Sequence, residues 1–231
     1  MADITLTWLG HGSFRFDTAD GTRVYVDPFL THNPKCPDNE KQPERVDVIA
    51  VTHGHGDHVA DLVDLQKKHG AIVVAMVEIG DWLVGKNGVD EDKVQAGNKG
   101  GTTEAAGVRF TLVGAHHSGS LPDGSYGGEP AGIVASAGGK TIYFAGDTDV
   151  FGDMQLIARL YEPDLAVLPI GDFYTMGPRQ AALALELLGV KRCLPCHYGT
   201  FPPLVGRPNE LKKLASGVTI EDIEPGQSIT V

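Results

Sequence analysis

One short segment, THGHGDH at positions 52–58, constrains this 231-residue chain more than any other feature. It follows the apolar run VDVIAV at 46–51, whose β-branched residues predict a buried strand, and it precedes a helical pattern. Alternate residues of a nearly extended chain point the same way, so His53, His55 and Asp57 can converge on one side. The intervening glycines leave room for such a turn because they carry no Cβ atom.

Neutral imidazoles and a carboxylate are suitable ligands for a divalent transition metal, so this spacing predicts a metal site. The alternative interpretation is a polar turn in which Asp57 simply caps the following helix. Three histidines and one aspartate at these positions would arise by chance in roughly one chain in a thousand of this composition. The metal site is therefore the interpretation we adopt.

Short apolar segments alternate with helical patterns and Gly or Pro turns along the whole chain. Strands are expected at 4–9, 13–17, 23–26, 46–51, 71–75, 108–115, 132–137, 141–145, 165–169, 191–196, 219–223 and 228–231. Helices are expected at 59–69, 77–84, 153–161, 178–188 and 208–215. This alternation predicts a layered α/β protein, and the absence of a composition shift predicts a single domain over residues 1–231.

Two long polar loops interrupt this pattern, at 30–45 and 119–130. Loops of this length in a compact domain are typically lids or mobile functional segments.

Four further apolar strands run directly into polar tips that carry histidine or aspartate, namely GAHHS at 114–118, AGDT at 145–148, IGD at 170–172 and PCHY at 195–198. Because active sites of layered α/β proteins gather at one edge of the sheet, these tips predict further ligands for the metal site.

Composition excludes several other classes of protein. The chain has 30 Asp and Glu residues against 19 Lys and Arg, a formal net charge of −11, which argues against binding long nucleic acids. No apolar run is long enough to span a bilayer, and the first residues carry no secretory signal. Three cysteines, an odd number, fit a reducing compartment. We therefore expect a cytoplasmic protein without a membrane partner.

The motif H-x-H-x-D-H, together with WLGHGSF, DPFLT, PAGI, AGDT, IGDFYTMGP and CHYGTFP, resembles the metallo-β-lactamase superfamily over essentially the whole chain. Within it, the chain is similar to a branch of metal-dependent hydrolases related to L-ascorbate-6-phosphate lactonase. The resemblance implies a four-layer αβ/βα sandwich with a binuclear metal site at the loop edge of its two sheets. It implies that one metal is held by His53, His55 and His117, the other by Asp57, His58 and His197, and that Asp147 bridges them.

Several roles remain open at this point. Spacing alone does not choose between His116 and His117, and the resemblance selects His117 because the branch places its ligand directly before serine. His11 matches a histidine typical of the branch and is expected at the active site, as a ligand, a substrate donor or a support for a ligand. Asp27 is either an acceptor behind a ligand imidazole or a turn-forming aspartate. Asp57 is expected to orient the nucleophile or accept its proton.

Metal-assisted hydrolysis is the chemistry that this ligand set predicts. A metal-bridging hydroxide would attack a small ester, lactone or phosphoester, and no serine nucleophile elbow competes with it. Zinc is favoured on base rate for two divalent ions held by nitrogen and oxygen, with manganese, nickel or iron as alternatives. The partner is a small-molecule substrate, and assembly into a homo-oligomer is left open.

Three rival functions remain. The same centre could serve a phosphodiesterase or nuclease acting on small nucleotides. A diiron redox protein on this fold is less favoured, because such relatives carry an acidic residue where this chain has His55. A regulatory metal-binding protein without catalysis is the third.

The C-x-x-C spacing of Cys193 and Cys196 is interpreted as core packing, since residues three apart on a strand face opposite sides. The aromatic segments near Phe173 and Phe201 either wall the substrate pocket or pack the helix starts.

Overall fold

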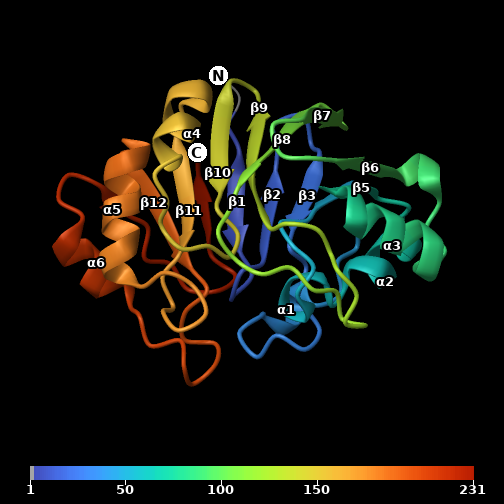
Figure 1. Ribbon diagram of the computed structural model, residues 1–231, viewed down its shortest axis with the longest axis horizontal. Coiled ribbons are helices and arrows are strands. Elements are labelled where there is room, and N and C mark those ends of the chain that lie inside the picture. The colour runs from blue at the N-terminus through green and yellow to red at the C-terminus, as the bar shows by residue number, and fades with distance from the viewer. Residues whose placement is uncertain (1–2) are drawn as a thin grey trace.

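The computed structural model describes residues 3–231, which form two seven-stranded β-sheets packed face to face (Figure 1). The first sheet has the spatial order β14 (Ser228–Thr230), β1 (Thr5–Trp8), β2 (Phe14–Asp17), β3 (Arg23–Val26), β4 (Val48–Ala50), β5 (Ile72–Met76) and β6 (Val94–Gly97). The second has the order β13 (Thr219–Ile220), β12 (Arg192–Cys196), β11 (Leu165–Pro169), β10 (Lys140–Phe144), β9 (Ala131–Ala137), β8 (Val108–Gly114) and β7 (Thr102–Ala105). In each sheet, three neighbouring strand pairs are antiparallel and three are parallel.

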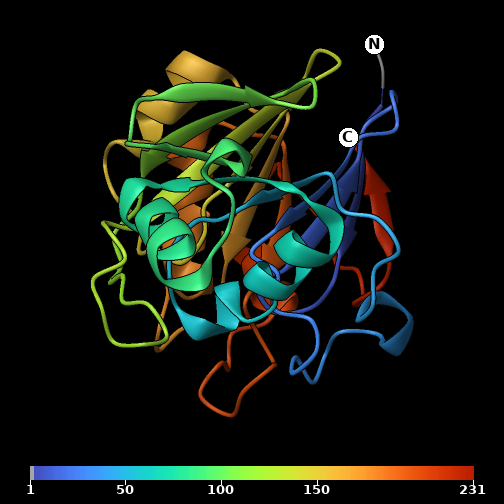
Figure 2. The same cartoon turned by 90° about the vertical axis from the view of Figure 1, so that its right-hand side faces the viewer.

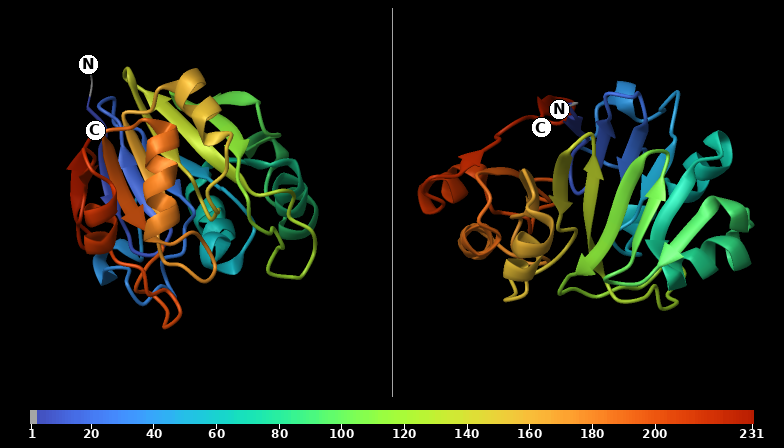
Figure 3. Two further views of the ribbon diagram at one scale, coloured as in Figure 1. Left: turned by 60° about the vertical axis from the view of Figure 1, so that its left-hand side comes forward. Right: turned by 90° about the horizontal axis from the view of Figure 1, so that it is seen from above.

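Helices cover the outer faces of both sheets (Figure 3). The first sheet carries α1 (Gly56–Val59), α2 (Leu62–His69) and α3 (Val77–Asn87), and the second carries α4 (Met154–Tyr161), α5 (Pro178–Leu188) and α6 (Pro208–Leu214). Two short 3₁₀ turns lie at Asp38–Glu40 and Glu91–Lys93. The layers therefore run helix, sheet, sheet, helix, which confirms the predicted αβ/βα sandwich. The turned view in Figure 2 shows the same layers from the side of the first three helices.

Aromatic side chains join the two sheets at the centre of the molecule. The ring of Phe144, on the second sheet, lies 5.6 Å from Phe14 and 6.1 Å from Phe16, which both belong to the first sheet. All three are buried in a cluster that includes residues of both sheets. A second apolar cluster lies between the second sheet and its helices. Burial of large rings contributes most to such a core, because each removes a large apolar area from water.

The two cysteines of the C-x-x-C spacing point to opposite faces of β12. Cys196 belongs to the core between the sheets, whereas Cys193 belongs to the cluster beneath the helices. Both thiols are free and buried, and burial raises the pKa of each. The expected divergence of the two sulfurs is confirmed, and a shared thiolate metal site is excluded for this pair.

The helix expected over 59–69 is broken into α1 and α2. The backbone N–H of Asp61 donates to the carbonyl of Pro28 (3.0 Å) instead of continuing the helix. The Asp61 side chain in turn accepts hydrogen bonds from the backbone N–H groups of Leu30 and Thr31. The expected single helix is therefore wrong at this point, because a contact with a distant loop takes the donor that the helix needs.

The same contacts fix the beginning of the long polar loop at 30–45. Asn33 is fully buried, and its side-chain amide donates to the carbonyls of Gly10 and Phe29. Further along, Arg15 forms an ion pair of 2.8 Å with Glu40. These contacts tie the loop to the first sheet and to the turn after β1, and its expected role as a lid stays a prediction.

Two strands, β6 and β7, were not expected from the sequence. Their residues, VQAG and TTEA, are mostly half-exposed or exposed and contain no apolar run. Each lies at the free edge of its sheet, where only one side of the strand is paired. Tertiary pairing, not local pattern, therefore creates these strands. No helix within residues 3–231 is long and apolar enough to cross a membrane.

Replacing Phe16 by alanine tests the assignment of the inter-sheet core. Phe16→Ala is expected to lower the free energy of unfolding by about 3–5 kcal/mol, because the buried ring leaves a cavity. Urea denaturation measures this loss. The control is Leu160→Ala on α4, where the side chain is 70% exposed and the change should stay within about 0.5 kcal/mol. Equal losses in the two variants would contradict the placement of Phe16.

Candidate metal centre

The residues predicted as ligands converge because the strands that carry them end at one edge of the sandwich. His11 follows β1, the segment 53–58 follows β4, His117 follows β8, Asp147 follows β10 and His197 follows β12. Within the first sheet, the strand pairings make β1 and β4 run in the same direction, and within the second sheet they do the same for β8, β10 and β12. All five strands end at the edge near α1, at the bottom of Figure 1. Residues from both sheets therefore meet in one place.

Two clusters of side chains form at this edge. In the first, potential ligand atoms of His53, His55 and His117 lie within 4.8 Å of one another. Nε2 of His53 is 3.1 Å from Nδ1 of His55, and the imidazole of His117 lies edge-on to both rings. We call these three residues the first cluster. Since all three come from loops after β4 and β8, the cluster depends on contact between the two sheets.

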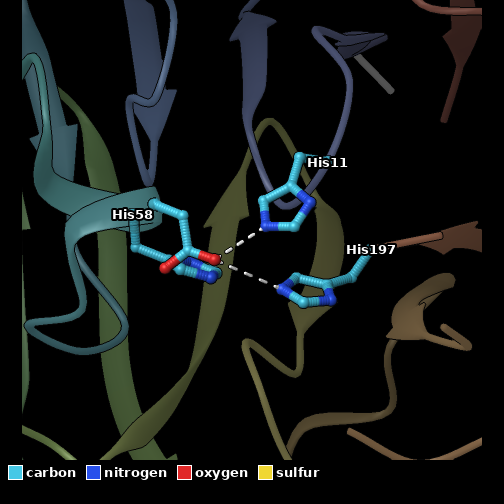
Figure 4. A group of neighbouring side chains, drawn as sticks. His11, His58 and His197 are labelled. Atoms are coloured by element: carbon cyan, nitrogen blue, oxygen red, sulfur yellow. Dashed lines mark hydrogen bonds and ion pairs between the residues drawn. The ribbon is translucent and has the colours of Figure 1, made fainter. Parts of the chain in front are cut away.

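The second cluster consists of His11, Asp57, His58 and His197, whose potential ligand atoms also lie within 4.8 Å of one another. Figure 4 shows the three imidazoles around a carboxylate oxygen. Oδ2 of Asp57 lies 2.9 Å from Nε2 of His11 and 3.9 Å from Nε2 of His197. The sequence suggested that Asp57 converges with His53 and His55. Instead, the start of α1 turns Asp57 toward the second cluster.

Asp147 lies between the two clusters. Its Oδ2 is 3.1 Å from Nε2 of His197 and 3.6 Å from Nε2 of His117. Its Oδ1 is 3.5 Å from Nε2 of His58. One carboxylate therefore faces imidazoles of both clusters, which is the position that a bridging ligand needs.

Buried nitrogens without partners provide a test of whether the residues fit a metal. Nε2 of His58 and Nε2 of His197 are buried and make no hydrogen bond, although both lie near Asp147. Unpaired buried polar atoms are rare in folded proteins and require an explanation. A metal ion that accepts these lone pairs satisfies them, so the histidine and aspartate set fits a divalent transition metal.

Burial and charge act in opposite directions on the histidines of the site. Burial lowers the pKa of His11 to about 4 and lowers that of His53 well below its ordinary value, which keeps both imidazoles neutral. Burial also opposes protonation of His58, but the carboxylates of Asp147 and Asp27 outweigh it and raise the pKa of His58. The neutral imidazoles are in the form that binds metals, and the carboxylates attract positive charge to the same point.

Asp27 supports His58 from behind. Its Oδ2 lies 2.8 Å from Nδ1 of His58, and its Oδ1 accepts a hydrogen bond from the backbone N–H of Thr52. The side chain is 1% exposed, and its backbone has a φ of 48°, a left-handed conformation that costs free energy for aspartate. The hydrogen bond at Nδ1 leaves Nε2 of His58 free to face the clusters, so the expected role of Asp27 as an acceptor behind a ligand is supported by this geometry.

Close packing at the site also explains why a residue without a Cβ atom stands at position 12 in the first turn. A Cβ atom added to Gly12 would lie 2.7 Å from Cε1 of His58. The preceding His11 has a φ of 56°, which turns its ring toward Asp57. Glycine at position 12 thus leaves the room that the imidazole of His58 needs beside this turn.

The two adjacent histidines have different surroundings. His116 is exposed and stacks on Phe151 with 4.6 Å between ring centroids, whereas His117 belongs to the first cluster. The structure thus brings together nine of the side chains that the sequence associated with the site, namely His11, Asp27, His53, His55, Asp57, His58, His117, Asp147 and His197. His116 and Asp172, from the predicted tip IGD, belong to neither cluster. Of the remaining histidines, His32 is exposed and His69 ends α2.

Two residues near the site were missed from sequence. The hydroxyl of Thr52 lies 3.0 Å from Nδ1 of His53, and that of Ser118 lies 3.4 Å from Nε2 of His55. Both directly flank a predicted ligand segment, which is the signal that could have identified them. A threonine or serine is, however, common at strand ends for reasons unrelated to a site, so position alone was not decisive.

Relatives of similar sequence are described as metal-dependent hydrolases. A family model described as a beta-lactamase superfamily domain matches residues 22–198. A metal-dependent hydrolase of Koribacter versatilis is 46% identical over 99% of this chain and 98% of its own length. One of Herpetosiphon aurantiacus is also 46% identical, over 100% of this chain and 99% of its own.

The similarity extends to solved structures. A metallo hydrolase from the hyperthermophilic archaeon Ignicoccus hospitalis superposes with a TM-score of 0.87 and 34% identity. The superposition covers 99% of this chain and 98% of the archaeal one. The residues that form the two clusters, except His11, all lie inside the region matched by the family model.

Asp27→Asn tests the support of His58. The variant is expected to weaken binding of a divalent metal by about 10–100-fold, because the imidazole loses the carboxylate that fixes its orientation. Competition with a chromophoric chelator measures this affinity. Asp17→Asn is the matched control, since Asp17 ends β2 at the opposite edge of the sheet and pairs with Arg23. An affinity as high in Asp27→Asn as in the control would show that Asp27 only shapes the turn.

Proposed function

Since this chain belongs to the metallo-β-lactamase superfamily and is a metal-dependent hydrolase, we propose a function at the level of the substrate. In this proposal the protein uses two divalent ions to hydrolyse a small ester, lactone or phosphoester. In this proposal the first cluster would hold one ion, Asp57, His58 and His197 would hold the other, and Asp147 would be a ligand of both. The observation that carries the proposal is the place of Asp147 between the two clusters, next to the Nε2 atoms of His58 and His197, which are buried and make no hydrogen bond.

The ligand set consists of nitrogen and oxygen atoms, which suits zinc best on base rate and also suits manganese, nickel or iron. Bound at such a site, two ions lower the pKa of water toward neutrality and polarise the substrate oxygen that is attacked. The remaining work falls to side chains of the protein. Residues 1–231 act in this proposal as one domain in the cytoplasm, a setting consistent with three free, buried cysteines.

In this proposal Asp57 accepts a proton from the attacking water, and His11 positions Asp57. The neutral His11 donates from Nε2 to Oδ2 of Asp57, while its Nδ1 is buried without a partner. Burial raises the pKa of Asp57, but the hydrogen bond from His11 outweighs it and holds that pKa below its usual range. The carboxylate therefore stays ionised, and it is 34% exposed and can accept the proton of an attacking water. His11 is a positioning residue for that carboxylate.

The surroundings of the site favour an ester or lactone over a phosphoester. A hollow of about 460 Å³ adjoins His117 and is lined by hydroxyl groups of Ser118, Ser120 and Tyr126 and by the carboxylate of Glu129. No lysine or arginine lines it. Since phosphate recognition commonly uses cationic side chains, a phosphodiester or small nucleotide is the second candidate rather than the first.

Metal removal tests the proposal directly. Protein treated with a chelator is expected to lose hydrolysis of a panel of esters, lactones and phosphodiesters, and zinc or manganese should restore it. The readout is the rate of hydrolysis, with metal content measured on the same samples. Equal background rates with and without metal would contradict metal-assisted hydrolysis.

The adjacent histidines provide a matched pair for the ligand assignment. His117→Ala is expected to lower kcat/KM by more than about 100-fold, a larger loss than removal of a residue behind a ligand causes. The same variant should bind fewer metal ions per protein. His116→Ala removes an imidazole one residue away and should leave both quantities unchanged, because His116 faces Phe151. The reverse result would assign the ligand to His116.

A further inference from the structure

A short loop after β11 lies between two parts of the metal centre. β11 is the neighbour of both β10 and β12 in the second sheet, and these strands lead into Asp147 and His197. The loop at 170–177 therefore emerges between the two side chains. Its base is tied to this edge, because the N–H of Met176 donates to the carbonyl of Thr148 (3.0 Å). The loop is therefore held next to the metal centre by a backbone hydrogen bond.

The backbone of this loop is strained. Asp172 and Phe173 have φ values of 67° and 61°, although neither is glycine. Seven residues other than glycine have a left-handed backbone within residues 3–231, and three of the others are His11, Asp27 and His197. Five of these seven thus belong to the metal centre or to this loop. Strain of this kind concentrates where function holds a side chain in place.

The strained loop presents aromatic side chains to solvent. Phe173 is 71% exposed and Tyr174 is 55% exposed, and their rings pack edge to face at 4.7 Å. Neither ring contributes much to the core, so folding stability does not account for them. Exposed aromatic groups gathered in one place are typical of a binding surface.

A second loop extends this aromatic surface to the centre itself. The loop at 199–206 packs against the first, and the N–H of Gly206 donates to the carbonyl of Gly171. It carries Phe201, which is partly exposed and lies edge-on to His11 with 5.3 Å between ring centroids. Both loops project below the sheets in Figure 1, on the side of the metal centre. One aromatic ring thus lies against the second cluster, and two exposed rings lie on the loop that packs beside it.

We propose that Phe173, Tyr174 and Phe201 form an aromatic rim that binds an apolar acyl or alkyl group of the substrate. This inference rests on the proposed function and narrows its substrate class to esters or lactones with an apolar chain. The hollow beside the first cluster is lined by hydroxyl groups and Glu129 instead. The site therefore has an apolar flank next to His11 and a polar flank next to His117, which orients the substrate across the two clusters.

A series of γ-lactones with alkyl side chains of increasing length tests the rim. With zinc-loaded protein, kcat/KM is expected to rise with each methylene group, up to about fourfold where the added group is fully buried. Phe173→Ser should reduce this dependence on chain length, because the chain loses its apolar contact. Phe173→Leu should retain most of it. The control Leu160→Ser alters an equally exposed residue on α4 and should leave the dependence as it is in the original chain.

Binding provides a readout that does not require turnover. Calorimetric titration of zinc-loaded protein with butanoate, hexanoate and octanoate should give affinities that increase with chain length, and Phe173→Ser should flatten the increase. If no ester, lactone or phosphodiester is hydrolysed but this binding pattern holds, the proposed function fails, while binding of an apolar chain by the rim stands. If lactones are hydrolysed but Phe173→Ser keeps the dependence on chain length in both measurements, the rim is overturned and the proposed function stands.

Self-association through the same aromatic groups is the competing role. Sedimentation of the original chain and of Phe173→Ser separates the two. The rim predicts the same mass for both proteins. A drop in mass in Phe173→Ser, with binding of the carboxylates unchanged, would assign the aromatic groups to contact between copies of the chain and overturn the inference.

Discussion

The structure depends on one electrostatic constraint at the edge of the sandwich: a buried carboxylate must share its space with several imidazoles. Asp147 faces nitrogens of His58, His117 and His197, and two of these nitrogens are buried without a hydrogen-bond partner. Such an arrangement is costly in a dry interior unless a cation occupies it. A bound cation would offset this cost, so the arrangement fits the metal-dependent hydrolase that the comparisons indicate.

The rest of the fold can be understood as support for this arrangement. Two sheets, joined by the contacts of Phe144 with Phe14 and Phe16, hold their strand ends at fixed positions. The backbone at the ends accepts strain, as the left-handed conformations of His11 and Asp27 show. A stable apolar core makes such strain tolerable, because its free energy exceeds the local cost at each strained residue. The positions of the side chains at the site are thus maintained by the apolar core between the sheets.

Local patterns predicted most strands and helices, and the exceptions share a physical cause. The helix expected from Val59 onward breaks at Asp61, whose N–H donates to Pro28 instead. The edge strands β6 and β7 lack an apolar pattern and exist because a neighbouring strand pairs with them. In each case a partner distant in sequence takes or supplies a backbone hydrogen bond, and no local pattern records that partner.

For the candidate site, the sequence by itself determined the ligand types and most of their positions, since the spacing of His53, His55 and Asp57 after a buried strand already predicted a metal. Spacing alone left open how these ligands are divided, and only the family resemblance implied a division, which the tertiary structure then decided. It turned Asp57 away from the two histidines, brought His117 rather than His116 into the first cluster, and set aromatic loops beside one cluster alone. The reason is physical: spacing fixes which side chains share a local face, but ligation requires atoms from two sheets to meet, and that depends on how the sheets pack.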